Sequence, residues 1–139
     1  MSDKKIEKSP IQITIDKWIE GWNSHDIEKI METYADQPEI FDQKIKEVFP
    51  EKNDFKLENK DEIRQYFQAI LDTYPNIQVK PHGLWLKFNE ALLEYYLYLT
   101  EDSYVDMISK FYLNKQNKIQ GQFDYYGLGY KEAKKKEWI

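Results

Sequence analysis

The chain has 139 residues, the size of one ordinary domain, and this is enough to bury a hydrophobic core. Its aromatic content of 16% is too high for a disordered chain, and its net charge of −5 argues against a nucleic-acid partner. The sequence has no Cys, which excludes disulfides and thiolate chemistry, and no apolar run approaches the length of a membrane span.

The two ends of the chain differ in composition from the rest. Residues 1–9 are charged and are expected to form a disordered N-terminal extension before a single domain at 10–130. The extension lacks the apolar core of a signal peptide, so we expect a soluble, cytoplasmic protein with no membrane partner. Residues 131–139, KEAKKKEWI, form a basic C-terminal tail for which a solvated terminus is the simplest interpretation.

Helical periodicity marks the start of the domain. Apolar residues at helical spacing predict a first helix from Ile11 to about Asn23, and Asn23 is expected to adopt the left-handed conformation that closes it. Asp26 suits the first turn of a second helix over residues 27–34. A short extended piece is expected at residues 39–42, after which residues 43–59 form a long loop or an irregular hairpin.

A third helix and four strands complete the predicted elements. The helix is predicted over residues 60–73, and the strands over residues 77–88, 91–100, 104–113 and 118–126. The short polar connections between the strands are typical of antiparallel meanders. Helices first and strands last imply an α+β fold, in which the helices pack on one face of a curved antiparallel sheet.

The last predicted strand contains GQFDYYGLGY and allows two orientations. Simple hydrophobic alternation places Ile119, Phe123 and Tyr125 inward and leaves Asp124 exposed. The opposite orientation places Gln122, Asp124 and Tyr126 in the interior, where a carboxyl group among amides and phenols would resemble a reaction site. Alternation by itself favours the first orientation.

The order of the segments resembles a known family. The run WIEGWNSHDIEKIMETYAD, then NKDEIRQYF, then strands that end in KIQGQFDYYG are similar to the NTF2-like superfamily. The nearest resemblance is to its SnoaL-like branch of polyketide cyclases and ketosteroid isomerases, and it covers about residues 11–127. It implies a cone of three N-terminal helices on a strongly curved antiparallel sheet, with an apolar pocket at the wide end and a homodimer formed through the outer sheet face.

The isomerase pattern is only partly matched by this sequence. The resemblance implies a catalytic base at Asp42, seven residues after Ala35 in ADQPEIFDQ. The positions that match the two oxyanion donors hold Trp18 and Ser109 in place of Tyr and Asp. Because two of the three residue types differ, the familiar steroid isomerisation is not expected.

The cyclase pattern directs attention to a different acid. There the general acid/base is an Asp on the last long strand, and the matching residue is Asp124. The resemblance also implies that Gln120 points inward together with Gln122, Asp124 and Tyr126. Two carboxyl groups in an apolar cavity would have raised pKa values, which suits proton abstraction beside a carbonyl group. The residues expected to line the pocket and bind the substrate are Trp18, Trp22, Tyr66, Tyr95, Ser109, Gln122 and Tyr126.

Three classes of function remain open. The first is a cofactor-independent acid/base enzyme of isomerase or cyclase type, acting on a hydrophobic carbonyl compound through Asp124 and Asp42. The second is a protein that binds a hydrophobic small molecule without turnover, and the third is a dimerisation module whose interior is filled by its own side chains. No cofactor is expected, and the two separated residues His25 and His82 do not predict a metal site.

Overall fold

All six strands of the structure belong to one sheet, and helices cover one of its faces. The computed structural model of the protein describes residues 8–137, so residues 1–7 of the expected extension and residues 138–139 of the expected tail lie outside it. The elements are α1 (Pro10–Asn23), α2 (Ile27–Glu32), β1 (Tyr34–Phe41), α3 (Ile45–Val48), β2 (Lys56–Leu57), α4 (Lys60–Thr73), β3 (Gln78–Lys87), β4 (Glu90–Thr100), β5 (Ser103–Leu113), β6 (Ile119–Gly129) and α5 (Tyr130–Lys135).

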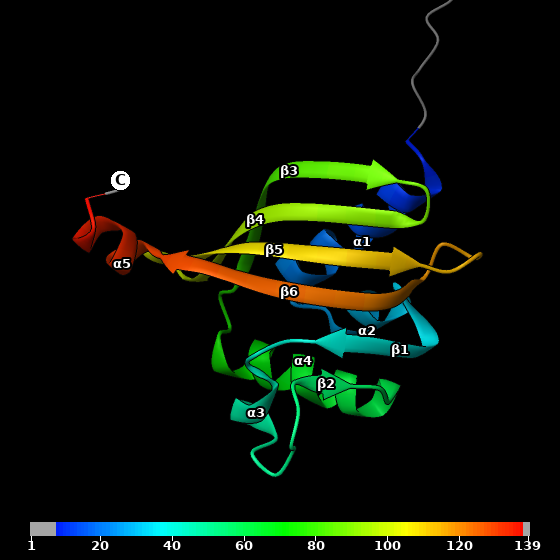
Figure 1. Cartoon of the computed structure of the whole chain (residues 1–139), viewed down its shortest axis with the longest axis horizontal. Helices are drawn as coiled ribbons and strands as arrows, with labels where there is room; N and C mark the ends of the chain where they lie inside the picture. Colours follow the sequence, from blue (N-terminus) through cyan, green and yellow to red (C-terminus); the bar gives the residue numbers. More distant parts are fainter. Residues whose placement is uncertain (1–7, 138–139) are drawn as a thin grey trace, which may run out of the picture.

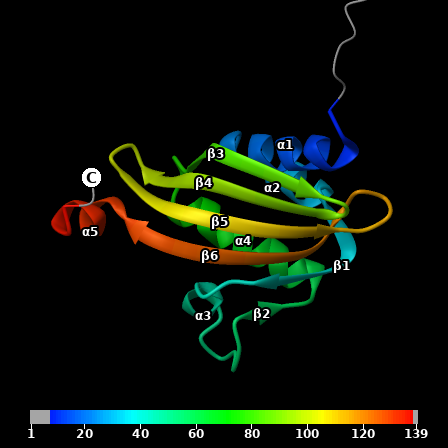
Figure 2. The same cartoon turned by 45° about the horizontal axis from the view of Figure 1, so that its top comes forward.

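The sheet is mixed, which corrects the expected antiparallel sheet. Its strand order is β2–β1–β6–β5–β4–β3, and every neighbouring pair is antiparallel except β1 and β6, which run parallel. Parallel neighbours need a long connection, and here all the elements from α3 to β5 lie between the two strands in sequence. Helices α1, α2 and α4 lie on the same side of the sheet, as predicted (Figures 1 and 2).

Helix α1 has defined signals at both ends. Ser9 is its N-cap and accepts a hydrogen bond from the Gln12 amide, and Pro10 stands in the first turn, where no amide donor is needed. At the other end, the side-chain amide of Asn23 exchanges two hydrogen bonds with the backbone of Val79 on β3. The left-handed residue is His25, with φ of 56°, and not Asn23 as expected, because the Asn23 amide is used to fix the helix to the sheet.

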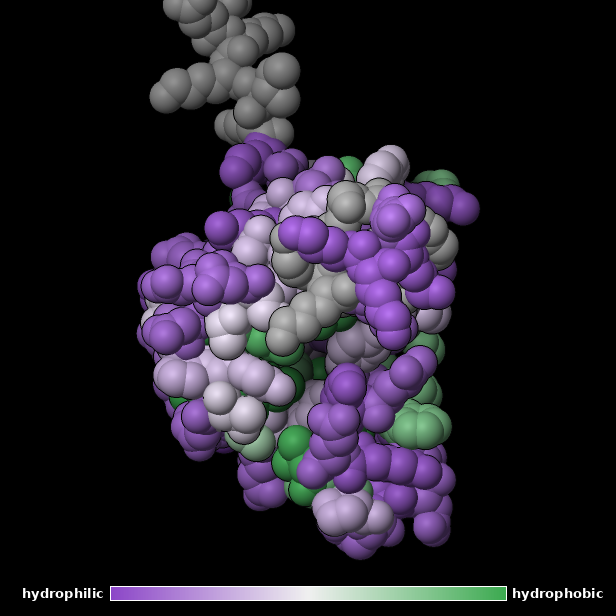
Figure 3. Space-filling model, turned by 90° about the vertical axis from the view of Figure 1, so that its left-hand side faces the viewer, coloured by the Kyte–Doolittle hydropathy of each residue, from purple (hydrophilic) through white to green (hydrophobic). Residues whose placement is uncertain are grey.

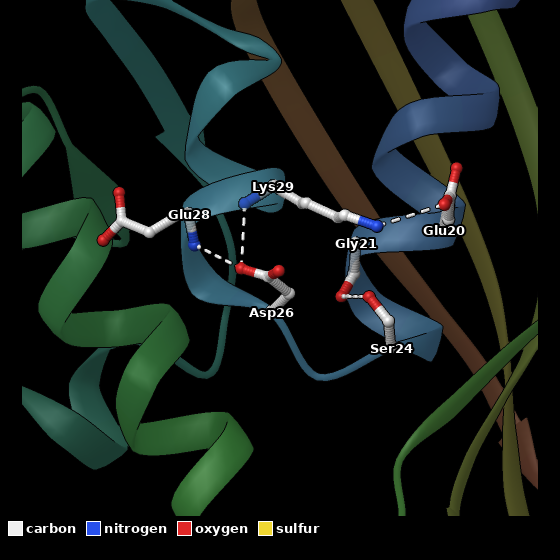
Figure 4. Close-up of polar contacts among 6 residues, drawn as sticks. All are labelled: Glu20, Gly21, Ser24, Asp26, Glu28 and Lys29. Atoms are coloured by element: carbon white, nitrogen blue, oxygen red, sulfur yellow. Dashed lines mark hydrogen bonds and ion pairs between the residues drawn. The ribbon is translucent and has the colours of Figure 1, made fainter.

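The turn from α1 into α2 brings the two helices into close contact (Figure 4). The Asp26 carboxylate caps α2 by accepting hydrogen bonds from the Glu28 and Lys29 amides, at 3.1 and 3.2 Å. A Cβ atom on Gly21 would lie 2.9 Å from the side chain and the backbone nitrogen of Ile30. This crossing therefore requires glycine at position 21.

The second helix ends earlier than the sequence predicts. Helix α2 stops at Glu32, and Tyr34, which was expected to be helical, begins β1. Tyr34 pairs in the sheet with Ile119 of β6, more than eighty residues later in the chain. This long-range pairing sets the boundary between α2 and β1, and the local periodicity of the sequence carries no information about such a pairing. The expected loop or hairpin at residues 43–59 contains the short elements α3 and β2.

Strand β6 contains a β-bulge that changes which residues point inward. Leu113 of β5 pairs with Ile119, but the preceding residue, Tyr112, pairs with Gly121, so Gln120 is an extra residue. Ile119 and Gln122 are both buried as a result, although they stand three residues apart. Simple alternation was therefore wrong about Asp124, and the resemblance was wrong about Gln120, which is exposed and donates a hydrogen bond to the Gln37 carbonyl.

The core lies between the helices and the inner face of the sheet. On β4 and β5 the inner face carries Leu93, Tyr95, Met107 and Phe111, which are all buried. Aromatic rings meet edge to face in this layer, with Trp18 5.1 Å from Phe111 and 5.8 Å from Tyr95. Among residues 8–137, no helix combines the length and apolar character needed to cross a membrane.

Candidate functional site

Two carboxyl groups lie side by side at the inner face of the sheet. Phe41 of β1 pairs with Phe123 of β6, and their rings stack on the outer face with centroids 4.5 Å apart. Asp42 directly follows Phe41 in the sequence, and Asp124 directly follows Phe123. Both side chains therefore turn to the opposite, inner face of the sheet. The parallel register of β1 and β6 thus brings together the two acids that the sequence singled out.

Asp42 is held at the end of β1 by both backbone and side-chain contacts. It is 6% exposed, and its Oδ1 accepts hydrogen bonds from the Lys44 amide at 2.8 Å and the Tyr126 hydroxyl at 2.5 Å. Its own amide donates to the Phe55 carbonyl, which attaches the loop before β2 to this position. The carboxyl group is consequently fixed in orientation.

Asp124 accepts hydrogen bonds from two side chains of the sheet. Ser109 on β5 donates to Oδ1 at 2.6 Å, and the Gln122 side-chain nitrogen lies 2.9 and 3.1 Å from Oδ1 and Oδ2. Because the Ser109 hydrogen is used in this way, the Tyr95 hydroxyl, 2.7 Å from the Ser109 oxygen, must be the donor in that pair. Tyr95 and Ser109 therefore form one chain of donors that ends at Asp124.

A second chain of donors reaches Asp124 from α1. The Trp18 indole N–H donates to the Tyr34 hydroxyl at 2.9 Å, and that hydroxyl donates to the Gln122 side-chain oxygen at 2.5 Å. The Gln122 nitrogen then faces Asp124. Every hydrogen bond in both chains is directed toward the carboxyl group, which makes Asp124 the common acceptor of the network.

Burial and the second acid set the protonation of Asp124. Burial first, and then hydrogen bonding and repulsion from the neighbouring Asp42 carboxyl, raise the pKa of Asp124 well above its usual range. The donors Ser109 and Gln122 act in the opposite direction, because hydrogen bonds to the carboxylate favour the ionised form. The pKa nevertheless stays raised, since desolvation is the largest effect.

A small cavity adjoins the acids, and a larger pocket lies outside it. The inner cavity has a volume of about 50 Å³, and Asp42, Asp124, Trp22 and Tyr66 are among its lining residues. The outer pocket, of about 530 Å³, is lined by α3, the C-terminal part of α4 and the nearby ends of β4, β5 and β6. Figure 3 views this end of the molecule, where apolar side chains lie in a hollow between hydrophilic ones. The two spaces share the lining residues Tyr66, Ile70, Leu97 and Tyr126.

The residues proposed from the sequence take different places around these spaces. Trp18, Trp22, Tyr66, Tyr95, Gln122 and Tyr126 line the inner cavity together with the two acids. Ser109 is fully buried, lines neither space, and contacts Asp124 from behind. Trp18 already donates its indole hydrogen to Tyr34, and Ser109 donates its hydroxyl hydrogen to Asp124. Neither of the two positions that match the isomerase donors therefore has a hydrogen left to donate to a ligand.

Two features of the site were missed by sequence reasoning. Tyr34 was assigned to a helix, although its hydroxyl joins α1 to Gln122. The outer pocket depends on Glu47 and Val48 of α3 and on Lys44 just before this helix, all in a segment expected to be a loop or hairpin. For Tyr34, the only local signal was an aromatic ring at the end of the predicted helix.

Neither histidine belongs to the site. His25 lies in the turn after α1, as expected, and its Nε2 donates to the Ile77 carbonyl. His82 lies on the outer side of the sheet against the Tyr96 ring, with Glu94 and Asp106 at 3.5 and 3.3 Å. Within residues 8–137, no three His, Asp or Glu side chains are grouped so that they could hold a metal ion.

Comparisons with known proteins identify the family that this chain resembles. The SnoaL-like domain family matches residues 15–118. The search of curated protein sequences gave no match. Among solved structures, a SnoaL-like protein of unknown function from Burkholderia thailandensis is similar, with a TM-score of 0.75, 18% identity, and coverage of 89% of this chain and 100% of that one.

Two further structures carry functional names of their own. A Kribbella flavida protein provisionally assigned as a ketosteroid isomerase has a TM-score of 0.67 and 11% identity, with coverage of 87% of this chain and 80% of that one. SalBIII is an epoxide hydrolase/cyclase-like enzyme described in pyran ring formation in the polyether salinomycin. It has a TM-score of 0.67 and 12% identity, with coverage of 85% and 91%. At these identities the likeness concerns the fold alone.

Proposed function

The chain belongs to the SnoaL-like domain family of the NTF2-like superfamily, and on that premise we propose that it is a cofactor-independent acid/base enzyme. Its substrate is a hydrophobic small molecule with an enolisable carbonyl group, and the reaction is of isomerase or cyclase type. Asp124 is the acid/base group, and Asp42 is its partner. In this proposal the helices and the sheet enclose a cone, as in the cyclases and isomerases that the sequence resembles, and the outer pocket is its wide end.

The position of the outer pocket next to the two acids is the observation that supports this function best. A volume of about 530 Å³ is within the range of pockets that bind small molecules. Its inner side is formed by Leu97, Ile70, Tyr66 and Tyr126, which also line the cavity containing Asp42 and Asp124. A ligand whose apolar body lies in the outer pocket would therefore have its polar end directed at the acids.

The raised pKa of Asp124 suits this chemistry. An ionised carboxylate of raised pKa is a stronger base than an ordinary aspartate, and it removes a proton from the carbon beside the carbonyl group. The electron pair of the C–H bond moves toward the carbonyl oxygen and gives an enol or enolate. Asp124 then returns its proton to the same carbon or to a conjugated one, so no cofactor or oxidant is consumed.

Hydrogen–deuterium exchange into 2-tetralone, an apolar enolisable ketone, tests this proposal. In D₂O the wild-type protein should accelerate deuterium incorporation beside the carbonyl, measured by NMR, whereas Asp124→Asn should reduce the rate to that of buffer. Asp36→Asn changes an exposed acid of β1 and should retain the wild-type rate. Equal rates for wild type and Asp124→Asn would contradict the catalytic role.

A non-catalytic ligand-binding protein is the second candidate. The size of the inner cavity favours it, because about 50 Å³ admits only a few atoms beside Asp42 and Asp124. Binding of 2-tetralone without exchange would support this alternative. The third class, a dimerisation module, is less consistent with a pocket of about 530 Å³.

We also propose that the protein is a homodimer that associates through the outer face of the sheet. Phe41, Phe123 and Tyr112 form an aromatic group on this face, and Trp85 and Tyr125 are 56% and 54% exposed there. Exposed aromatic side chains of this kind are enriched at protein–protein interfaces. In such a dimer each copy would present this same face to the other, as twofold symmetry requires.

A further inference from the structure

Two buried hydrogen-bond donors beside the acids lack a hydrogen bond of normal geometry to any of the residues that the structure describes. The indole Nε1 of Trp22 and the hydroxyl of Tyr66 are fully buried atoms, in residues that are 5% and 1% exposed. Among residues 8–137, neither atom makes a hydrogen bond of normal length and angle, although the Tyr66 hydroxyl lies close enough to Asp42 and Tyr126 to interact with both. Both residues line the inner cavity with Asp42 and Asp124. Folded proteins rarely leave such groups unpaired, so a pair of them in the lining of one cavity calls for an explanation.

The two donors are fixed in place by aromatic packing. The ring of Trp22 on α1 meets Phe67 edge to face at 5.1 Å and Trp18 at 6.1 Å. Tyr66 on α4 packs against the same Phe67, at 5.9 Å. Neither side chain can turn to find a partner elsewhere without disturbing this cluster. The donors therefore remain available to whatever enters the cavity.

The chemistry of the two groups defines what they can bind. An indole N–H only donates. Burial, and then the charges of Asp42 and Asp124, raise the pKa of Tyr66 above its usual range, so its phenol stays neutral and keeps its hydrogen. Two donors from residues that line one cavity suit an acceptor oxygen, while the adjacent acids disfavour an anionic ligand.

We propose that Trp22 and Tyr66 together bind the oxygen atom of the ligand, and that this ligand is a neutral apolar compound with a carbonyl or hydroxyl oxygen. This inference rests on the proposed function, because it assumes that the pocket binds a small molecule. In the family that the sequence resembles, the ligand oxygen is bound at the positions that here hold Trp18 and Ser109. In this protein, Trp22 and Tyr66 would bind it instead. The two donors would also set the distance between the reacting carbon and Asp124.

The test compares the binding of 2-naphthol with that of 2-methylnaphthalene, which has the same shape but lacks the oxygen. Wild-type protein should bind 2-naphthol at least tenfold more tightly, as measured by fluorescence titration. Tyr66→Phe and Trp22→Phe should each lower this ratio of affinities about tenfold. Because the smaller ring in Trp22→Phe affects the binding of both probes equally, its effect cancels in the ratio of their affinities.

Thermal unfolding provides an independent readout with a matched control. Tyr66→Phe removes a hydroxyl that makes no hydrogen bond of normal geometry to residues 8–137, so its Tm should equal or exceed that of the wild type. Tyr34→Phe is the same chemical change at a buried phenol with two partners, and it should lower the Tm. A lowered Tm for Tyr66→Phe would show that its hydroxyl has a structural partner and would overturn the inference.

The outcomes separate this inference from the proposed function. If wild type binds both probes equally, or if Tyr66→Phe and Trp22→Phe leave the ratio unchanged, the oxygen site is wrong although the apolar pocket stands. If neither probe binds, both the pocket and the oxygen site are contradicted. The anion 2-naphthoate should bind at least tenfold more weakly than 2-naphthol, and equal binding would refute the preference for a neutral ligand.

Discussion

The hydroxyl of Tyr34 donates a hydrogen bond of 2.5 Å to the side-chain oxygen of Gln122, and this contact fixes the orientation of the amide group. With its oxygen held by Tyr34, the amide can present only its nitrogen to Asp124. Trp18 in turn donates to the Tyr34 hydroxyl, so a residue on the first helix influences a carboxyl group on the last strand. The predictions below follow from this network and from the surfaces around it.

Tyr34→Phe should destabilise the protein by about 1–3 kcal/mol, because the Trp18 indole N–H and the Gln122 oxygen are left buried without a partner. Chemical denaturation monitored by circular dichroism gives the free energy of unfolding. Tyr125→Phe, at an exposed tyrosine of β6, should change it by less than about 0.5 kcal/mol. A stability loss of the same size in both variants would argue against the buried network.

Asp124 should make the protein less stable as the pH rises. Its pKa is raised in the folded state, so between the unfolded value and the folded one the folded protein binds more protons than the unfolded chain. Its contribution to stability is fully present below the unfolded pKa and is lost as the pH rises through the folded pKa. The slope approaches about 1.4 kcal/mol per pH unit in that window.

Asp124→Asn should remove that pH dependence, because the amide cannot ionise. Urea unfolding of both proteins across a pH series measures the difference in unfolding free energy. As the pH rises above the unfolded pKa of an aspartate, the free energy of unfolding of Asp124→Asn should increase relative to that of the wild type. Parallel pH profiles for the two proteins would mean that Asp124 titrates normally.

Ser109→Ala should destabilise the protein by about 1–3 kcal/mol, because the buried Tyr95 hydroxyl loses its acceptor. It should also raise the pKa of Asp124 further, since the Ser109 hydroxyl stabilises the ionised carboxyl. Adding Tyr95→Phe should recover part of the lost stability by removing the unpaired hydroxyl. A double-mutant cycle measures the coupling, and simple additivity of the two changes would contradict it.

Tyr125→Lys should weaken the proposed dimer at least tenfold by placing a charge on the outer sheet face. Sedimentation velocity over a range of concentrations measures the association. Ile13→Lys is the matched control, because Ile13 is 45% exposed on α1, away from the sheet. A wild-type protein that stays monomeric, or a dimer unaffected by Tyr125→Lys, would contradict the proposed interface.

Much of the fold could be predicted because its signals are local. The helix predicted over residues 60–73 has the bounds of α4, whose apolar residues recur at helical spacing and whose N-cap is Asn59. The strands predicted at 91–100 and 104–113 correspond to β4 and β5 within one residue at each end. The ladder between these two strands is regular over most of its length, so side chains alternate there with period two.

The candidate site was predictable only in its ingredients. Residues Asp42 and Asp124 were identified, but the reason for their proximity is the parallel register of β1 and β6. Hydrophobic alternation placed Asp124 outside because it assumed an unbroken strand, whereas the bulge at Gln120 shifts the pattern by one residue. Gly121, next to the bulged Gln120, is a residue type that often marks a bulge, but the bulge itself is defined by the pairing with the partner strand.

The sequence by itself determined the longer helices and strands, the SnoaL-like resemblance and the candidate site residues, because periodicity and residue order are properties of the chain. The tertiary structure alone decided where β1 begins, which way β6 faces, and which donors remain free. Trp18 and Ser109 use their hydrogens within the protein, while Trp22 and Tyr66 do not. The hydrogen bonds from Tyr34 to Gln122 and from Ser109 to Asp124 join residues 88 and 15 positions apart, and only folding brings them within bonding distance.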